Sequence, residues 1–150
     1  MDTIFALASA PGRAGISVIR LSGSDAITAA ELITRSDLTG SKPKLRTVYS
    51  LDGSFIDEAL ILIFSEPHSF TGEHVAEIHL HGSHAVVSST IKLLNNISGL
   101  RPAEAGEFTR RSLDNGKIDL AQVEGLGDLI DAETEAQLKQ AARVFTGALG

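Results

Sequence analysis

The sequence predicts an α+β fold, in which helices alternate with strands of a mostly antiparallel or mixed sheet. Two observations support this prediction. Short runs rich in β-branched and apolar residues are bounded by glycine, proline and other turn residues, as strands are. Between these runs lie segments whose apolar residues recur at helical spacing. The predicted order is two strands, a helix, three strands, a helix, a strand and a short helix, followed by a long helix.

The first third of the chain is predicted to form two strands and a helix. The β-branched residues of the second strand suggest that it is buried. Ser24 or Asp25 can serve as the N-cap of the helix, because short polar side chains accept hydrogen bonds from the first free N–H groups. The expected elements are a strand over Asp2 to Ser9, a turn over Ala10 to Gly15, a strand over Ile16 to Leu21 and a helix through Ile33.

The middle of the chain is predicted to form a hairpin, a further strand and a second helix. Asp52-Gly53 is a strong turn pair, so the strands on either side of it should pair. Gly82 ends the next strand, and Ser83 can cap the helix that follows. The expected elements are strands Leu45 to Leu51, Ile56 to Phe64 and Val75 to His81, a helix His84 to Asn96, a short strand Leu100 to Ala105 and a short helix Glu107 to Leu113.

From Asp119 onwards, apolar residues recur at helical spacing with Asp, Glu and Gln between them. These apolar residues are Leu120, Val123, Leu126, Ile130, Leu138 and Phe145. An amphipathic helix gains most of its stability from packing, and the sequence offers no second long helix to cover this one. Either the helix folds back on the preceding domain, or its partners lie beyond Gly150 or on another chain. We expect missing partners.

Composition and motif spacing exclude several classes of function. The chain has 150 residues, a formal net charge of -6 and a pI of about 5.3, so a general phosphate-coating surface is not expected. A local RNA contact is not excluded. The chain has no cysteine and no apolar run of about 18 residues, which excludes thiolate chemistry and argues against a membrane span. Neither the phosphate-loop spacing nor the dinucleotide fingerprint occurs, so this chain alone should bind neither GTP nor NAD by those mechanisms.

Three polar residues alternate along the strand Val75 to His81, namely Glu77, His79 and His81. They face one side, because successive side chains of a strand point in opposite directions. Glu77 is either solvated on an open face or lines a pocket. His79 and His81, with His84 nearby, are either metal ligands or surface histidines. Because no nearby Asp or Cys completes a ligand set, we predict no metal site.

Two basic residues are candidate anion contacts. Arg20 lies in an otherwise apolar strand, and arginine is rarely buried without a partner, so it either surfaces at the strand end or meets an anion. Lys117 follows an Asn-Gly turn and, taken alone, is an ordinary turn lysine. The segment around Lys117 carries three further charged residues, which are Glu107, Arg110 and Arg111. We expect this segment to hold an anionic, planar small molecule where the compact domain meets the long helix.

Several stretches match a known protein family in their order and spacing. They are DTIFALAS, APGRAGISVIRLSG, SFTGEHVAEIHLHG and RPAEAGEFTRRSLDNGKIDLAQVEGLGDLIDAETEAQ. Through them, essentially the whole chain resembles the N-terminal region of the MnmE (TrmE) family of tRNA-modification GTPases. Several independent motifs carry this resemblance, so it is more specific than any single motif.

The resemblance implies two domains. Residues 1–118 would form a folate-binding and dimerisation domain, related to the tetrahydrofolate-binding fold of glycine-cleavage T proteins. Residues 119–150 would form the first part of a helical domain into which the family inserts a G domain. The sequence is expected to stop before that G domain. GTP, potassium and magnesium would belong to the absent G domain, so no GTPase activity is expected from this chain alone.

The resemblance also implies a folate site. By matching motifs, the folate-contacting residues would be Arg20 in ISVIRLSG, Glu77 in VAEIHLHG and Lys117 in NGKIDLAQ. A carboxylate can accept the adjacent N–H groups of a reduced pterin, while Arg20 or Lys117 can pair with the anionic glutamyl tail. The ligand would be 5-formyl- or 5,10-methylene-tetrahydrofolate. No residue is predicted to be catalytic.

For the full protein, the resemblance implies modification of the wobble uridine of certain tRNAs in the cytoplasm, in the carboxymethylaminomethyl-uridine pathway. The implied partners are the flavoprotein MnmG, tRNA and a second copy of the chain in a homodimer. Two alternatives remain open from the sequence. One is a pure dimerisation module in which folate is incidental, and the other is a free-standing folate-dependent aminomethyl- or methyltransferase.

Overall fold

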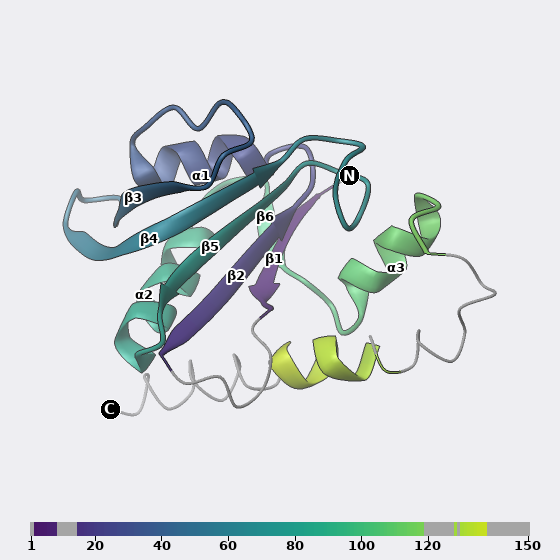
Figure 1. The fold of residues 1–150 in the computed structure, drawn as a ribbon. Helices are drawn as coiled ribbons and strands as arrows, with labels where there is room; N and C mark the ends of the chain where they lie inside the picture. Colours follow the sequence, from purple (N-terminus) through teal and green to yellow (C-terminus); the bar gives the residue numbers. More distant parts are fainter. Residues whose placement is uncertain (1, 9–14, 119–127, 129, 138–150) are drawn as a thin grey trace.

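A computed structural model of the protein describes residues 2–8, 15–118, 128 and 130–137. The strands of this part form one sheet in the order β3-β4-β5-β2-β1-β6 (Figure 1). Neighbouring strands are antiparallel, except that β1 and β6 are parallel. The predicted α+β class with a mixed sheet is therefore confirmed. The strands are β1 Thr3–Leu7, β2 Ile16–Ser22, β3 Lys44–Tyr49, β4 Phe55–Phe64, β5 Val75–His81 and β6 Leu100–Pro102.

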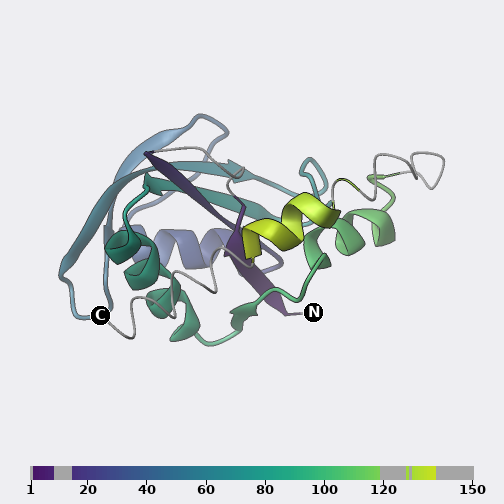
Figure 2. The same cartoon turned by 90° about the horizontal axis from the view of Figure 1, so that it is seen from below.

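Helices α1 (Ala26–Thr34) and α2 (His84–Asn95) lie on the same face of the sheet (Figures 1 and 2). Alternate apolar side chains of the central strands point toward them and form the main core with residues from both helices. The fully buried members of this core include Phe5, Ile19, Ile78, Ile33 and Leu94. The charged and histidine side chains of β2 and β5, which are Arg20, Glu77, His79 and His81, consequently lie on the opposite face.

Helix α3 (Glu107–Asp114) packs against the opposite face at β1, where Phe108 joins Ile4 and Ala6 in a second core. Residues 130–137 are helical and lie beside α3 (Figures 1 and 2). The Gln137 side chain donates to the Glu104 carbonyl at 2.9 Å, and Ala136 is buried. This described part of the predicted long helix thus folds back on the domain, so the expectation that its partners are missing is wrong here.

Most predicted element boundaries agree with the structure to within two residues. Asp25 occupies the N-cap position of α1 but makes no side-chain capping bond; instead its N–H donates to Thr3 Oγ1 at 2.9 Å. Ser83 caps α2 as predicted, and its Oγ accepts the N–H of Val86 at 3.2 Å. β6 ends at Pro102 rather than Ala105, because the chain turns into α3 through Gly106.

Several sequence predictions fall outside the described residues. They concern the turn at 10–14 and the start of the long helix at 119–127. Within the segments that the structure does describe, no helix combines the length and the apolar character that crossing a membrane would require.

Candidate functional site

An arginine–glutamate pair lies on the sheet face opposite α1 and α2. The antiparallel register of β2 and β5 places Arg20 directly across from Glu77. Arg20 Nε donates to Glu77 Oε2 at 3.1 Å, and Nη2 lies 3.0 Å from the same oxygen. The two side chains are 25% and 16% exposed, respectively. The anion that Arg20 meets is therefore Glu77, and the pair remains accessible to a ligand.

Two phenylalanine rings flank the Arg20 guanidinium. Its Cζ lies 5.3 Å from the ring centroid of Phe70 and 5.9 Å from that of Phe108. Phe108 is buried in α3, whereas Phe70 is exposed. Aromatic faces attract a cation and offer a flat apolar surface to a planar ligand. Neither ring is predicted from the sequence, because no local pattern indicates that the loop before β5 and helix α3 meet beside β2.

Glu77, His79 and His81 share one face of β5, as their alternation predicts. Glu77 Oε1 lies 3.1 Å from His79 Nε2, so the carboxylate contacts both Arg20 and His79. His81 contacts a different carboxylate, Asp57, whose Oδ1 lies 2.8 Å from the His81 Nδ1. Throughout the described segments, no three His, Cys, Asp or Glu side chains are grouped in a way that could hold a metal ion.

Lys117 lies beside the same loop that carries Phe70. It follows α3, where its N–H donates to the Ser112 carbonyl at 2.8 Å, and its side chain is exposed. Its Cε would lie 3.5 Å from a Cβ atom placed on Gly72. The structure thus brings Arg20 and Glu77 into direct contact and places Lys117 next to the adjoining loop, without a contact between Lys117 and either of them.

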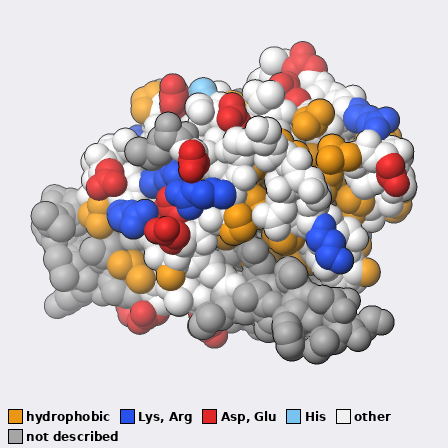
Figure 3. All heavy atoms as spheres, turned by 180° about the vertical axis from the view of Figure 1, so that it is seen from behind, with side chains coloured by type: hydrophobic (Ala, Val, Ile, Leu, Met, Phe, Trp, Pro, Cys, Tyr) orange, Lys and Arg blue, Asp and Glu red, His pale blue; other side chains and the backbone are white. Residues whose placement is uncertain are grey.

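A buried network of ion pairs joins α3 to the end of this loop. Arg111 Nη1 donates to Glu73 Oε1 at 3.0 Å, and its Nη2 donates to Glu107 Oε2 at 3.1 Å. Arg101 donates to both oxygens of Glu107 at 2.8 and 2.6 Å. Ser22 of β2 donates to Glu73 at 2.7 Å. Figure 3 shows basic and acidic side chains gathered side by side on the face seen from behind.

Glu107 and Arg111 are therefore not ligand-gripping groups, which corrects the expectation from the sequence. They are 1% and 4% exposed, and their charges are satisfied within the domain. Burial alone would raise the pKa of Glu107, but the hydrogen bonds from Arg101 and from the Glu104 N–H lower that pKa to about 2. Of the four charged residues singled out in this segment, Arg110 and Lys117 keep exposed side chains. The network holds α3, and with it Phe108, against β2.

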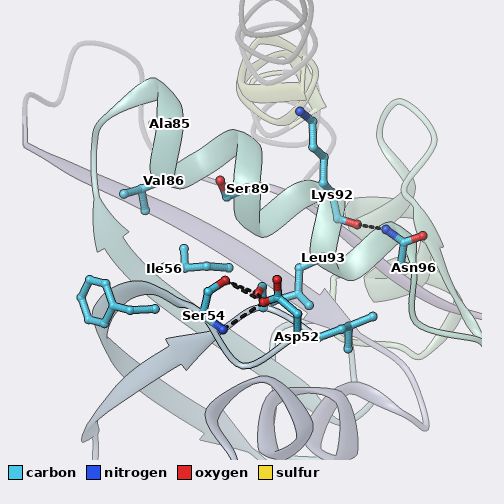
Figure 4. A pocket seen from close by; sticks show the side chains of 12 residues that line it. Asp52, Ser54, Ile56, Ala85, Val86, Ser89, Lys92, Leu93 and Asn96 are labelled. Carbon is cyan, nitrogen blue, oxygen red and sulfur yellow. Dashed lines mark hydrogen bonds between the residues drawn. The ribbon is translucent and has the colours of Figure 1, made fainter.

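Two cavities lie away from these residues. One, of about 520 Å³, lies between α2 and the β3–β4 turn (Figure 4). The Ser54 N–H and hydroxyl donate to Asp52 Oδ1 at 3.0 and 2.7 Å. The Asp52 carboxylate therefore stabilises the β3–β4 turn. The other cavity, of about 510 Å³, is lined by residues of α1, β4 and the loop after each of them. Neither is lined by Arg20, Glu77 or Lys117, so neither belongs to the candidate site.

The fold and the Arg20–Glu77 pair define an α+β domain with a partly exposed group of polar and aromatic side chains on one face of its sheet. The chain belongs to the family described as GTP-binding protein TrmE N-terminus, whose family model matches residues 3–117. The predicted family resemblance is thereby confirmed.

Three relatives illustrate the family. The chain is 61% and 59% identical over its whole length to proteins named tRNA modification GTPase MnmE from Roseobacter denitrificans and Cereibacter sphaeroides. It is 48% identical, over 99% of its length, to a mitochondrial 5-taurinomethyluridine-[tRNA] synthase subunit from Danio rerio. The chain spans about a third of the length of these relatives, namely 35% of the two bacterial proteins and 30% of the fish protein.

Proposed function

We propose that the chain is the N-terminal, folate-binding module of a tRNA-modification GTPase. The family membership and the names of the relatives support the tRNA-modification context. The observation that carries the folate proposal is the partly exposed Arg20–Glu77 pair beside the Phe70 ring. On this view, residues 1–118 are a domain related to the tetrahydrofolate-binding fold of glycine-cleavage T proteins.

In the proposed site, Glu77 accepts the adjacent N–H donors of a reduced pterin. Both Arg20 nitrogens approach Oε2, whereas Oε1 contacts only His79 among the described residues, so Oε1 keeps a lone-pair site for a ligand N–H group and a second such bond would displace one of the Arg20 contacts. Arg20 holds Glu77 in one orientation, which lowers the entropic cost of binding. Phe70 offers an exposed ring against which a planar pterin can stack.

Lys117 is better placed than Arg20 to pair with the anionic glutamyl tail of the folate. Arg20 is already committed to Glu77. Lys117 is exposed and has no ion pair within the part of the chain that the structure describes. A folate held at both ends would present its one-carbon unit, as in 5-formyl- or 5,10-methylene-tetrahydrofolate, in a fixed position. We assign no catalytic residue in this chain.

The larger assembly is part of the same proposal. It would comprise a homodimer of this domain, the flavoprotein MnmG and a tRNA whose wobble uridine receives the carboxymethylaminomethyl group. GTP, potassium and magnesium would be bound by a G domain outside this chain. Leu60 and Phe64 are exposed apolar residues on the same sheet face as Glu77, and they support an association surface there. Light scattering of the 150-residue chain tests the dimer, and a strict monomer at high concentration would contradict it.

Calorimetry with 5-formyltetrahydrofolate tests the folate site. Glu77→Ala should weaken binding about 10- to 150-fold, because a hydrogen bond to a charged group contributes about 1.5–3 kcal/mol. His79→Ala is the matched control on the same strand face and should have a smaller effect. Circular dichroism should show that both variants keep the fold. Equal affinities for the wild type and Glu77→Ala would refute the assignment.

A further inference from the structure

A row of basic residues follows the outermost strand on one side of the sheet. β3 pairs with β4 on one edge, and its other edge has no strand partner in the described sheet (Figure 1). Four cations lie on this strand or on the segment leading into it, and we call them the basic edge. They are Arg35, Lys42, Lys44 and Arg46. All four side chains are exposed or half-buried.

Among the described residues, the basic edge gathers four cations without an ion pair, whereas Lys92 and Lys117, which also lack one, lie singly on α2 and after α3. In the described part of the chain, Arg20, Arg101, Arg110 and Arg111 all pair with carboxylates. No member of the basic edge forms such a pair with any described residue. Lys44 Nζ and Arg46 Nη1 instead donate to the nearby carbonyls of Lys42 and Leu45, at 3.4 and 2.8 Å.

The cations are spread along the full length of the strand. The guanidinium of Arg35 lies over the ring of Tyr49, at the end of β3, with its Cζ 5.3 Å from the ring centroid. Lys44 and Arg46 stand two residues apart, which separates them by about 6.6–6.8 Å along a strand. Two neighbouring acidic groups offset part of this positive charge, because hydrogen bonds from backbone N–H groups leave a carboxylate ionised. Glu31 accepts the N–H of Leu38, and Asp37 accepts the N–H of Thr39, each at 2.9 Å.

We propose that the basic edge binds the phosphate backbone of RNA. A group of Lys and Arg side chains without ion pairs to the described residues along one edge is the complement of a phosphate chain, and it stands out on a chain whose net charge is -6. The choice of RNA among polyanions rests on the proposed function. Charges on an edge strand can alternatively serve to block pairing between sheets of different molecules. That explanation predicts aggregation of neutralised variants and no effect on RNA.

The test measures RNA binding by the 150-residue chain at a series of salt concentrations. Fluorescence anisotropy of a labelled, unmodified tRNA transcript gives the binding constant at each concentration. Four contacts predict a slope of log K against log salt of about -3. Lys44→Gln and Arg46→Gln should each reduce that slope by about 1 and weaken binding roughly tenfold at about 50 mM salt. Lys92→Gln removes an exposed, unpaired cation on α2 and should change neither quantity. Lys44→Arg, which keeps the charge, should retain binding.

Three outcomes would overturn the proposal. They are no RNA binding at about 50 mM salt, equal effects of Lys92→Gln and Lys44→Gln, and unchanged RNA binding with aggregation of the Lys44 and Arg46 variants. Titration of the same variants with 5-formyltetrahydrofolate separates this inference from the folate proposal. Loss of RNA binding with intact folate binding supports the basic edge, and absence of folate binding from every variant refutes only the folate site.

Discussion

Glu133 caps helix α3 through Thr109. Glu133 Oε1 accepts the N–H and the hydroxyl of Thr109 at 3.0 and 2.7 Å, and Oε2 accepts the N–H of Phe108 at 3.0 Å. The first N–H groups of a helix have no partner inside the helix, and a negative charge is favourable at that end. The N-cap residue of α3 is Gly106, which has no side chain to offer. A residue from the later helical segment therefore takes over the capping role.

Glu133→Ala should destabilise the domain by about 1–2 kcal/mol, which is the usual cost of losing a helix cap. Denaturation in urea, followed by circular dichroism, measures this change. Glu135→Ala removes a charge from the same helical segment at an exposed position and serves as the control. Equal losses in the free energy of unfolding for the two variants would show that the hydrogen bonds from α3 to Glu133 do not stabilise the domain.

Stability should fall in acid because of Glu107. Its pKa is lowered from 4.5 to about 2, so its ionised form stabilises the fold fully above about pH 4.5. That contribution, about 3 kcal/mol, should be lost as the pH falls from about 4.5 to about 2. Glu107→Gln should flatten this part of the pH profile in urea denaturation, whereas Glu104→Gln, at an exposed position, should leave it unchanged. If the free energy of unfolding of Glu107→Gln fell with pH in parallel with that of the wild type, the stabilising role of ionised Glu107 would be contradicted.

Gly72 and Gly116 should respond differently to substitution by alanine. Both have positive φ, at 83° and 71°, so each substitution carries a backbone cost of about 1–2 kcal/mol. A Cβ on Gly72 would in addition lie 2.8 Å from the Asn115 Cβ, whereas one on Gly116 would meet nothing within 4 Å. We therefore expect roughly 1–3 kcal/mol of further destabilisation for Gly72→Ala. Urea denaturation of the two variants compares them, and equal losses would argue against close packing of the loop on α3.

Ligand-induced shifts in melting temperature should separate folate from GTP. The sequence lacks the phosphate-loop spacing that supplies backbone N–H groups, a lysine and a hydroxyl to a nucleotide and Mg²⁺. GTP with Mg²⁺ should therefore leave the melting temperature unchanged. 5-Formyltetrahydrofolate at about 100 times its Kd should stabilise the fold by about 2.7 kcal/mol. A shift of the melting temperature with GTP but none with the folate would refute the proposal that this chain is a folate-binding module.

The fold was largely predictable because its elements carry local signals. The alternation along β5 predicts both its bounds and the shared face of Glu77 and His79, and the Asp52-Gly53 turn predicts the hairpin. The hairpin register could not be predicted, because a bulge between Val48 and Tyr49 shifts it. Such irregularities depend on tertiary packing rather than on hydrophobic pattern.

The candidate site was predictable only in part, because it is assembled from distant segments. The motif that contains Arg20 gives no indication that Phe70 and Phe108 approach its guanidinium. Local patterns likewise do not distinguish a ligand-binding arginine from Arg111, which is buried against Glu73 and Glu107. The roles proposed for Arg20, Glu77 and Lys117 toward a folate stay predictions.

The parallel pairing of β1 with β6 bears on how the polypeptide is made. Thr3 pairs with Leu100, so the outer edge of the first strand finds its partner only after roughly a hundred residues have been synthesised. The face of β1 that carries Ile4 is covered slightly later, when Phe108 has been synthesised. At about 5–20 residues per second, the ribosome needs about 5–20 s to reach that point. The nascent chain therefore carries an apolar strand with one open edge until β6 has left the ribosome, and only then can the six-stranded sheet be completed.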